Sequence, residues 1–393
     1  MSGCSNATEQ TDSTAPSIKP PTTPLANTVA PAATSTSKAT QSKQNLSTTT
    51  SSNTVATKHS KTEHSNDLGD YGDYPKLTNL IDELVTEQQF SRDDLIALFA
   101  QVKRRDDILE AMSKPAERTK TWAEYKPLFV NELGTSNGIK FWQKHADDLT
   151  RAAKQFNIPE ALIVAIIGVE TRYGTFKGKH RVIEALATLA FDHPPRAEFF
   201  YQQLKQFMVL ARDLNWNPME PLGSYAGAMG YAQFIPSSYI NLAIDFDGDN
   251  KPDLIDSPVD AIGSIANYFR HHNWQPGQPT LELAELSSKA IPEQLAPLLD
   301  KPLKPTTPIA TVEQAGLNAN PKRDDKTLVR PFTFINGQTT EYWYGHHNFF
   351  VITEYNHSKL YARAVLELAQ AIEQRYSGEI TLSIMEEGKS AAQ

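Results

Sequence analysis

The feature that most constrains this chain is the run from Ala161 to Val169, in which every residue is apolar or glycine. A helix that is apolar on all sides has to be buried. Pro159 and Glu160 suit the first turn of such a helix, and Gly174 suits its end. Glu170 follows the run directly. The sequence therefore predicts a buried helix that carries a carboxyl group at its C-terminal end.

The position of Glu170 favours the protonated carboxyl for three reasons. These are the loss of water, the negative end of the helix dipole and the apolar neighbours. A carboxylic acid that is neutral near pH 7 can donate its proton to a leaving oxygen, as general acid catalysis of glycosidic cleavage requires. The alternative is a structural bridge between a buried Glu170 and Arg172 or Arg181.

Composition separates a tether from a folded body. Residues 1–70 contain no Phe, Trp or Tyr and are rich in Ser, Thr, Pro and Ala, so they predict a disordered segment. We expect a folded body from about Asp70 to Ser377 and a frayed tail over 378–393. The net charge is −8 and no dense basic run occurs, which argues against nucleic acid as a partner. No stretch of 18 apolar residues is present, so we expect no membrane-spanning segment in this sequence.

Cys4 is the single cysteine, which excludes an internal disulfide and a cysteine-rich metal site. The triplet "SGC" followed by a long Ser/Thr/Pro tether resembles the end of a bacterial lipoprotein signal, although the apolar part of such a signal is missing. This pattern predicts lipidation of Cys4 and a periplasmic protein anchored to the outer membrane. The alternative is an inert thiol in a flexible tail.

Hydrophobic spacing predicts helices through most of the body. The helical segments are "KLTNLIDELVTEQQF", "SRDDLIALFAQVK" with Ser91 as its N-cap, "DDILEAMSK", "NGIKFWQKHADDLTRAAKQF", "RVIEALATLAF", "AEFFYQQLKQFMVLARDL", "PVDAIGSIANYFRHH" and "KLYARAVLELAQAIEQRY". After Pro276 the pattern changes to β-rich runs: "GQPTLELAEL", "IATVEQAG", "KTLVRPFTFI" and "TEYWYG". The Asn-Gly pair in "INGQ", residues 335–338, predicts a hairpin. We expect a mainly α (α+β) protein with a small β module before the last helix.

A second motif is "GSYAGAMGYAQFIPSSY", residues 223–239. Its glycines and alanines let the backbone approach a ligand closely. Its aromatic rings are Tyr225, Tyr231, Phe234 and Tyr239, and flat faces of this kind suit sugar rings. Gln233 supplies an amide that both donates and accepts hydrogen bonds. The alternative is an ordinary glycine-rich loop.

A third motif, "DFDGDNKPDLIDSPVD" at 245–260, is similar to an EF-hand loop. Three aspartates alternate at its start: Asp245, Asp247 and Asp249. Lys251 stands where an EF-hand donates a backbone carbonyl. The sixth position is Asn250 instead of glycine, and asparagine tolerates the left-handed conformation. The twelfth is Asp256, which is short for a bidentate ligand. A structural Ca²⁺ site is predicted; the alternative is a metal-free loop of Asx turns.

Four motifs occur together in order: "GVETRYG", "GAMGYAQFIPSSY", "DSPVDAIGSIANYF" and "FFVITEYNHSKLYARAV". With them the chain resembles the membrane-bound lytic murein transglycosylase B family, from about Tyr74 to Tyr376. The resemblance implies a lysozyme-like core that cleaves the β-1,4 bond between N-acetylmuramic acid and N-acetylglucosamine without water. The muramoyl 6-hydroxyl attacks the anomeric carbon and leaves a 1,6-anhydro ring.

The resemblance also implies a division of the chain. The expected parts are a helical domain at 71–150, a lysozyme-like core at 151–275, a small β domain at 276–345 and a segment that returns to the core at 346–377. Expected partners are peptidoglycan glycan strands and other cell-wall enzymes, and no cofactor is expected for catalysis.

One carboxylate fits this chemistry. Ordinary glycosidases need two, and neither later motif offers an obvious second. If the substrate supplies the nucleophile, Glu170 can act first as acid and then as base, with the substrate's N-acetyl group taking part of the second role. Three alternatives remain open: a muramidase that uses water, an inactive glycan-binding scaffold, and a calcium sensor.

Further roles follow from the resemblance, residue by residue. We expect Ser224 and Gln233 to lie near the N-acetyl groups, and Arg196 to bind a muramoyl peptide carboxylate. The residues expected to border the cleavage site are Tyr268, Tyr355, Asn356 and Tyr361. Tyr125 is expected to contribute from the helical domain, and Asp260 is expected to be the last metal ligand. The family often has two adjacent arginines where this chain has Pro195 and Arg196, which predicts weaker recognition of the peptide stem. Each tyrosine could instead belong to the core.

Overall fold

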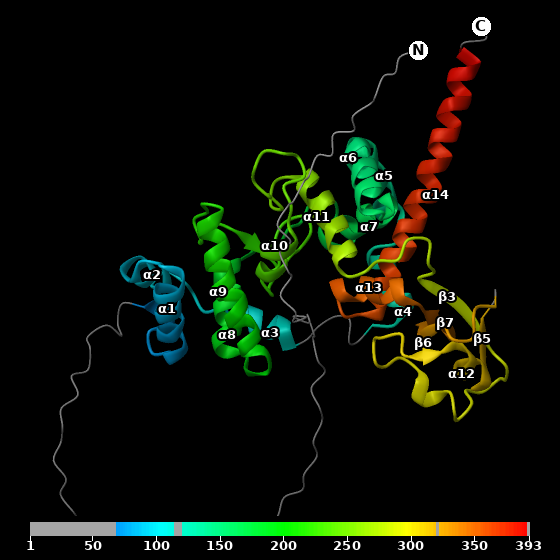
Figure 1. The fold of residues 1–393 in the computed structure, drawn as a ribbon, viewed down its shortest axis with the longest axis horizontal. Helices are drawn as coiled ribbons and strands as arrows, with labels where there is room; N and C mark the ends of the chain where they lie inside the picture. Colours follow the sequence, from blue (N-terminus) through cyan, green and yellow to red (C-terminus); the bar gives the residue numbers. More distant parts are fainter. Residues whose placement is uncertain (1–67, 114–119, 320–321, 391–393) are drawn as a thin grey trace, which may run out of the picture. The chain divides into compact units, whose positions relative to one another are not determined.

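The computed structural model describes residues 68–113, 120–319 and 322–390 (Figure 1). Cys4 and nearly all of the predicted tether lie outside the described residues. Helices dominate the described part and a small sheet accompanies them, so the mainly α (α+β) prediction is confirmed.

Helices follow one another along most of the described chain. In sequence order they are α1 (Pro75–Gln88), α2 (Arg92–Phe99), α3 (Asp106–Ser113), α4 (Trp122–Tyr125), α5 (Glu132–Lys144), α6 (Ala146–Phe156), α7 (Glu160–Thr171), α8 (Val182–Asp192), α9 (Ala197–Asp213), α10 (Pro236–Leu242), α11 (Pro258–His271), α12 (Ile309–Gln314), α13 (His347–Tyr355) and α14 (Lys359–Ser390). Short 3-10 turns lie at Gly69–Tyr71, Lys126–Leu128, Pro194–Arg196 and Ala296–Leu298. Ser91 caps α2 as predicted, since its side chain accepts a hydrogen bond from the backbone N–H of Asp94.

The strands form two separate sheets. Strands β1 (His180–Arg181) and β2 (Leu222–Gly223) make a short antiparallel pair. The larger sheet has the order β4-β6-β7-β3-β5, with every neighbouring pair antiparallel. Its members are β3 (Leu281–Leu286), β4 (Thr307–Pro308), β5 (Leu317–Ala319), β6 (Leu328–Asn336) and β7 (Thr339–Gly345).

Helix α7 is the centre of the helical core, and it packs against α5, α6, α11 and α14. Every residue from Ala161 to Val169 is buried, as predicted. The helix ends at Thr171, three residues before the predicted stop, because Arg172, Tyr173 and Gly174 all adopt the left-handed conformation. The ring of Tyr173 then folds back over the helix, where a Cβ on Gly168 would lie 2.5 Å from it.

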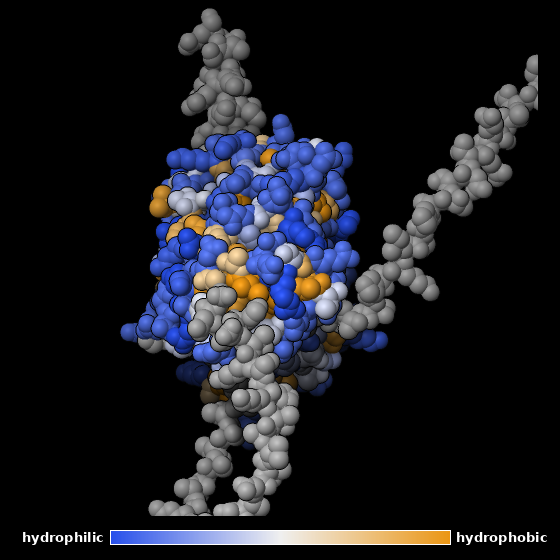
Figure 2. Space-filling view, turned by 90° about the vertical axis from the view of Figure 1, so that its left-hand side faces the viewer, coloured by the Kyte–Doolittle hydropathy of each residue, from blue (hydrophilic) through white to orange (hydrophobic). Residues whose placement is uncertain are grey.

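Helices α8 and α9 form a second packed group, with α1 and α10 against α9 and α3 against α8. Within the described residues, no single helix is both long and apolar enough to cross a membrane; α6 and α7 meet that test only as a pair bent by 115°. The face in Figure 2 is largely hydrophilic, with a band of hydrophobic residues near its middle.

The predicted hairpin is confirmed. In the β6–β7 pair, Asn336 lies opposite Thr339, so Gly337 and Gln338 form a two-residue turn. Gly337 has φ +64°, a conformation that glycine adopts without steric cost. The neighbouring sheet residues Phe332 and Phe334 are buried and join the main hydrophobic core.

Three expectations about local structure were wrong. The run "IATVEQAG" is helical over Ile309–Gln314, because Ile309, Val312 and Ala315 recur every third residue and bury one helix face. The stretch predicted as one helix from 137 to 156 breaks at His145 into α5 and α6. The backbone of the predicted tail continues α14 as far as Ser390, since its sequence contains no proline and is rich in helix-forming residues.

Arg363 of α14 ties the helical core to the sheet. Its guanidinium lies over the rings of three aromatic residues at 4.3–4.6 Å: Trp122, Phe334 and Trp343. It also forms ion pairs with Glu341 at 2.7 Å and Glu367 at 2.8 Å. The side chain is only 4% exposed, so both its charge and its packing depend on these partners.

We expect Arg363→Ala to lower the free energy of unfolding by about 3–5 kcal/mol, because it removes a buried side chain packed against three aromatic rings and leaves the half-buried Glu341 without its cation. Urea denaturation measures this change. Arg375→Ala is the matched control on the same helix: Arg375 pairs with Glu132 at the surface, so its loss should cost no more than about 1 kcal/mol. Equal losses for the two variants would contradict the assignment of Arg363 as the link.

Candidate active site

Glu170 and Tyr361 meet at the contact between α7 and α14. The hydroxyl of Tyr361 donates a hydrogen bond of 2.6 Å to Oε1 of Glu170, across 191 positions of sequence. Tyr361 is 2% exposed, and its backbone N–H donates to the Ser358 hydroxyl, 3.2 Å away, in the first turn of α14. Because the start of α14 holds Tyr361 in place, the hydrogen bond from Tyr361 fixes the orientation of the Glu170 carboxyl.

Two tyrosine hydroxyls surround this carboxyl and stay protonated. Burial raises the pKa of Tyr361 far above its usual range, and the negative charge of Glu170 raises it further. Burial and the same charge act in the same way on the pKa of Tyr355. Tyr125 of α4 adds to the shift at Tyr361, which places the predicted helical-domain tyrosine in this group. Both hydroxyls therefore remain hydrogen-bond donors near neutral pH.

Aromatic rings form one wall beside the carboxyl. Tyr268 of α11 lies 4.7 Å from Tyr355 between ring centroids, and Phe234 lies 5.6 Å from Tyr268. The Tyr355 hydroxyl donates to the carbonyl of Ala232 at 2.6 Å. His272, which the sequence did not single out, stacks on Tyr268 at 4.0 Å. Tyr268 is 2% exposed, so its ring mostly supports the wall.

The glycine-rich motif forms a loop held by its own polar side chains. Gln233 has φ +47°, and its amide donates to the carbonyls of Lys177 at 3.1 Å and Gly230 at 3.0 Å. The Ser224 hydroxyl accepts hydrogen bonds from the backbone N–H groups of Ala226 and Ala228. Each side chain has further capacity by type, a donor on Ser224 and an acceptor on Gln233.

Lys177 connects three motifs, although no periodicity or spacing in the sequence points to it. Its carbonyl accepts from Gln233, as above, and its ammonium donates to the carbonyl of Ile255 at 2.5 Å. The ammonium also lies 4.9 Å from the ring centre of Tyr231. Lys177 therefore joins the segment after α7 to both the glycine-rich loop and the acidic loop.

Arg196 and Asn356 have different surroundings. Arg196 lies over the rings of Phe199 at 4.1 Å and Phe200 at 5.0 Å, and burial lowers its pKa. Both rings belong to the first turn of α9. Asn356 caps the C-terminal end of α13, and its carbonyl accepts from the Ser358 N–H. It follows Tyr355 directly, so it lies at the aromatic wall.

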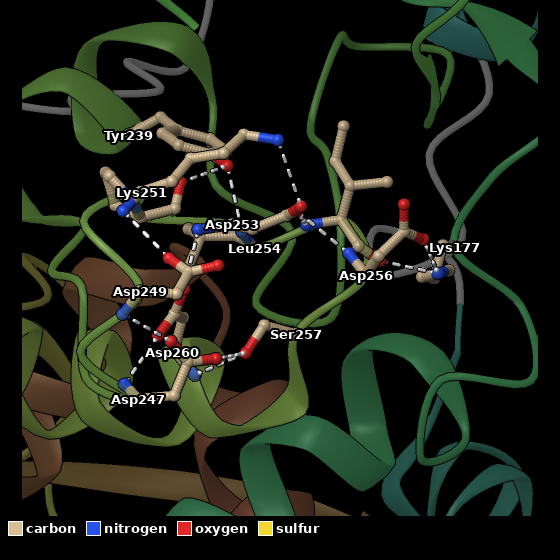
Figure 3. Close-up of polar contacts among 12 residues, drawn as sticks. Lys177, Tyr239, Asp247, Asp249, Lys251, Asp253, Leu254, Asp256, Ser257 and Asp260 are labelled. Carbon is tan, nitrogen blue, oxygen red and sulfur yellow. Dashed lines mark hydrogen bonds and ion pairs between the residues drawn. The ribbon is translucent and has the colours of Figure 1, made fainter.

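Three carboxylates of the acidic loop converge, and two of them, from Asp247 and Asp249, are labelled in Figure 3. One oxygen each from Asp245, Asp247 and Asp249 lie within 4.8 Å of one another, and all three residues are exposed. Asn250 has φ +72°, the left-handed conformation expected for the sixth loop position. The Asp245 carboxylate also accepts backbone N–H groups from Gly248 at 2.7 Å and Asn250 at 2.8 Å. The Asx turns and the cluster therefore coexist, and such oxygen donors fit Ca²⁺.

Neither residue considered as the last metal ligand joins this cluster. Asp260 is buried, and its carboxylate accepts backbone N–H groups from Phe246 at 2.7 Å, Asp247 at 3.1 Å and Asp253 at 2.7 Å. Burial raises its pKa, although these hydrogen bonds oppose the shift. Asp256 is exposed and lies 3.4 Å from Lys177. The Asp260 carboxylate thus holds the loop's backbone, and its role as the last metal ligand stays a prediction.

The fold and this site together define a class of protein. A buried helix presents one carboxyl beside buried tyrosine hydroxyls and a glycine-rich loop, as in lysozyme-like enzymes that act on glycans. The sequence family described as "Transglycosylase SLT domain" matches residues 72–370. The chain belongs to this family and is a lytic transglycosylase.

Known relatives agree with this assignment. Membrane-bound lytic murein transglycosylase B of Escherichia coli (strain K12) is 39% identical over 319 residues, which are 77% of this chain and 84% of the relative. The structure of the Escherichia coli lytic transglycosylase Slt35 in complex with calcium has a TM-score of 0.72 at 39% identity, over 79% of this chain and 96% of that one. SltB3 of Pseudomonas aeruginosa, solved with NAG-anhNAM-pentapeptide, has a TM-score of 0.64 at 27% identity, over 75% and 78% of the two chains.

We expect Asp260→Ala to lower the free energy of unfolding by about 2–3 kcal/mol when calcium is chelated, because three backbone N–H groups lose their acceptor. Asp256→Ala is the control from the same loop and should change stability by less than about 0.5 kcal/mol, since its side chain is exposed. Chemical denaturation of both variants measures the difference. An Asp260→Ala protein as stable as wild type would show that the loop does not depend on this carboxylate.

Proposed function

We propose that Glu170 is the single general acid and base with which this enzyme cleaves the β-1,4 bond between N-acetylmuramic acid and N-acetylglucosamine in peptidoglycan. The observation that carries the proposal is the hydrogen bond from Tyr361 to Glu170 at the end of a fully buried helix. It fixes the carboxyl where a proton transfer needs a defined geometry.

The proposed reaction has two proton transfers. Glu170 first protonates the leaving 4-oxygen of N-acetylglucosamine as the glycosidic bond breaks. The resulting carboxylate then takes the proton of the muramoyl 6-hydroxyl, whose oxygen forms a bond to the anomeric carbon and closes the 1,6-anhydro ring. The proton balance is closed, no water is consumed, and the substrate's N-acetyl group stabilises the developing positive charge. SltB3, a relative solved with an anhydromuramoyl ligand, supports this outcome.

The same proposal assigns the surrounding side chains to the substrate. Ser224 and Gln233 would contact the N-acetyl groups, and the wall of Tyr268, Tyr355 and Asn356 would border the cleaved bond. Tyr361 orients Glu170, with Tyr125 beside it. Arg196 would bind a peptide carboxylate from the α8–α9 side.

We further propose a structural Ca²⁺ held by the carboxylates of Asp245, Asp247 and Asp249 and by the carbonyl of Lys251. The converging oxygens support it, as does the relative solved with calcium. Its role would be to stabilise the loop, and catalysis would not need it. The membrane-bound description of the Escherichia coli relative supports a periplasmic enzyme anchored through a lipid at Cys4.

We expect Glu170→Gln to lower the rate of peptidoglycan cleavage at least about 100-fold, because glutamine cannot transfer the proton. Glu198→Gln, an exposed carboxylate on α9, is the control and should keep wild-type activity. Mass spectrometry of the wild-type digest should show 1,6-anhydromuramoyl ends.

Each alternative predicts a different result in this experiment. Reducing ends in place of anhydro ends would identify a muramidase. An intact wild-type protein that binds peptidoglycan and releases no fragment would be a scaffold. If Glu170→Gln cleaved as fast as wild type, the assignment of the catalytic residue would be wrong.

Calcium should raise the melting temperature of the chelator-treated protein and leave the specific activity of the folded enzyme unchanged. At about 100 times the dissociation constant, binding adds about 2.7 kcal/mol of stability. Asp247→Asn should remove most of this gain, whereas Asp256→Asn should keep it, because Asp256 lies outside the cluster. Calorimetric titration gives the affinity. If removal of calcium abolished the activity while the protein stayed folded, the ion would instead be a regulator.

A further inference from the structure

A cavity of about 520 Å³ lies where three segments of the chain meet. One segment is the approach to α4 with Lys120 and Trp122, the second is β6 with the loop before β4, and the third is the turn between α13 and α14. The volume is within the range of pockets that bind small ligands. None of the roles assigned to the active site uses this pocket.

The α13–α14 turn belongs to both the pocket and the active site. His357, Ser358 and Lys359 line the pocket. On one side of them is Tyr355, which bonds to the glycine-rich loop, and on the other is Tyr361, which bonds to Glu170. The same turn of chain therefore carries residues of the pocket and lies between two tyrosines of the active site.

The pocket has an excess of positive charge. Its lining includes Lys120, Lys301 and Lys359 but a single carboxylate, Asp300. Lys359 is already engaged, since its ammonium lies 2.5 Å from the Asp300 carboxylate and 2.6 Å from the carbonyl of Thr333. Lys120 and Lys301 form no ion pair with another residue in the part of the chain that the structure describes. Two cations therefore remain for an anionic ligand.

Two further features suit a peptide that carries carboxylates. Helix α14 begins at the pocket, so the positive end of its dipole is close to the ligand space. The walls also include the apolar side chains of Leu303 and Ile335, the latter 51% exposed, against which aliphatic side chains can pack.

We propose that this pocket binds the acidic stem peptide of the muramoyl residue whose glycan lies at Glu170, with Lys120 and Lys301 as its carboxylate-binding residues. The proposal rests on the proposed function, since it takes the ligand to be part of the same peptidoglycan strand. This pocket would give the enzyme a second contact with the peptide stem, in addition to the one proposed for Arg196.

The test compares two substrates, intact peptidoglycan and the same glycan after an amidase has removed its stem peptides. The double variant Lys120→Ala/Lys301→Ala should raise KM about tenfold on peptide-bearing strands, the loss expected when charge-assisted hydrogen bonds disappear. On stripped strands its KM and kcat should equal those of wild type. Lys326→Ala, an exposed lysine of the β-sheet region, is the control and should match wild type on both substrates.

A second measurement isolates binding from catalysis. Calorimetry on the full-length Glu170→Gln protein uses a muramoyl peptide with free carboxylates and the same peptide with its carboxylates amidated. The free acid should bind about tenfold more weakly when Lys120 and Lys301 are also alanine, and Lys120→Arg/Lys301→Arg should keep its affinity. The amidated peptide should bind both proteins equally.

The outcomes separate the two proposals. An equal loss on both substrates would show a structural role for the lysines and overturn the pocket assignment, and so would the absence of any change. Failure of the proposed function is visible without the variants, because the wild-type enzyme would then release no anhydromuramoyl ends from either substrate.

Discussion

The burial of α7 is the constraint on which the rest of the structure depends. Its apolar surface is covered on all sides by α5, α6, α11 and α14. This packing fixes the position of the helix in the core, and therefore the position of its last turn. Three consecutive left-handed residues then turn the chain away, and Tyr173 seals the turn against Gly168. Because of this packing, Glu170 is a carboxyl at the edge of a rigid core.

Helix α14 couples that carboxyl to the remainder of the molecule. Tyr361 and Arg363 are two residues apart and therefore point about 200° apart around the helix. Tyr361 reaches Glu170, and Arg363 reaches the aromatic rings and acidic groups of α4, β6 and β7. The orientation of the active-site carboxyl and the attachment of the sheet thus depend on the same few residues, and the proposed peptide pocket lies at the start of this helix.

In the acidic loop, the burial of each aspartate determines what its carboxylate binds. Asp245, Asp247 and Asp249 are exposed and converge on one point, which suits a cation. Asp260 is buried and holds backbone N–H groups from the start and the middle of the loop. Lys177 links this loop to the glycine-rich loop, so that both lie in fixed positions relative to the end of α7.

The sequence by itself determined the features that depend on neighbours along the chain. The apolar run predicted the buried helix that ends near Glu170, and the Asn336–Gly337 pair predicted the hairpin, because helix burial and tight turns are governed by local spacing. The alternating aspartates predicted a calcium site, and their carboxylates converge as such a site requires. Only the tertiary structure decided which distant groups meet. In the tertiary structure Tyr361 contacts Glu170, and Asp260 accepts hydrogen bonds from the backbone. Residues 309–314 form a helix, and three separate segments form the cationic pocket. These pairings depend on how helices and strands pack, and no spacing within one segment encodes them.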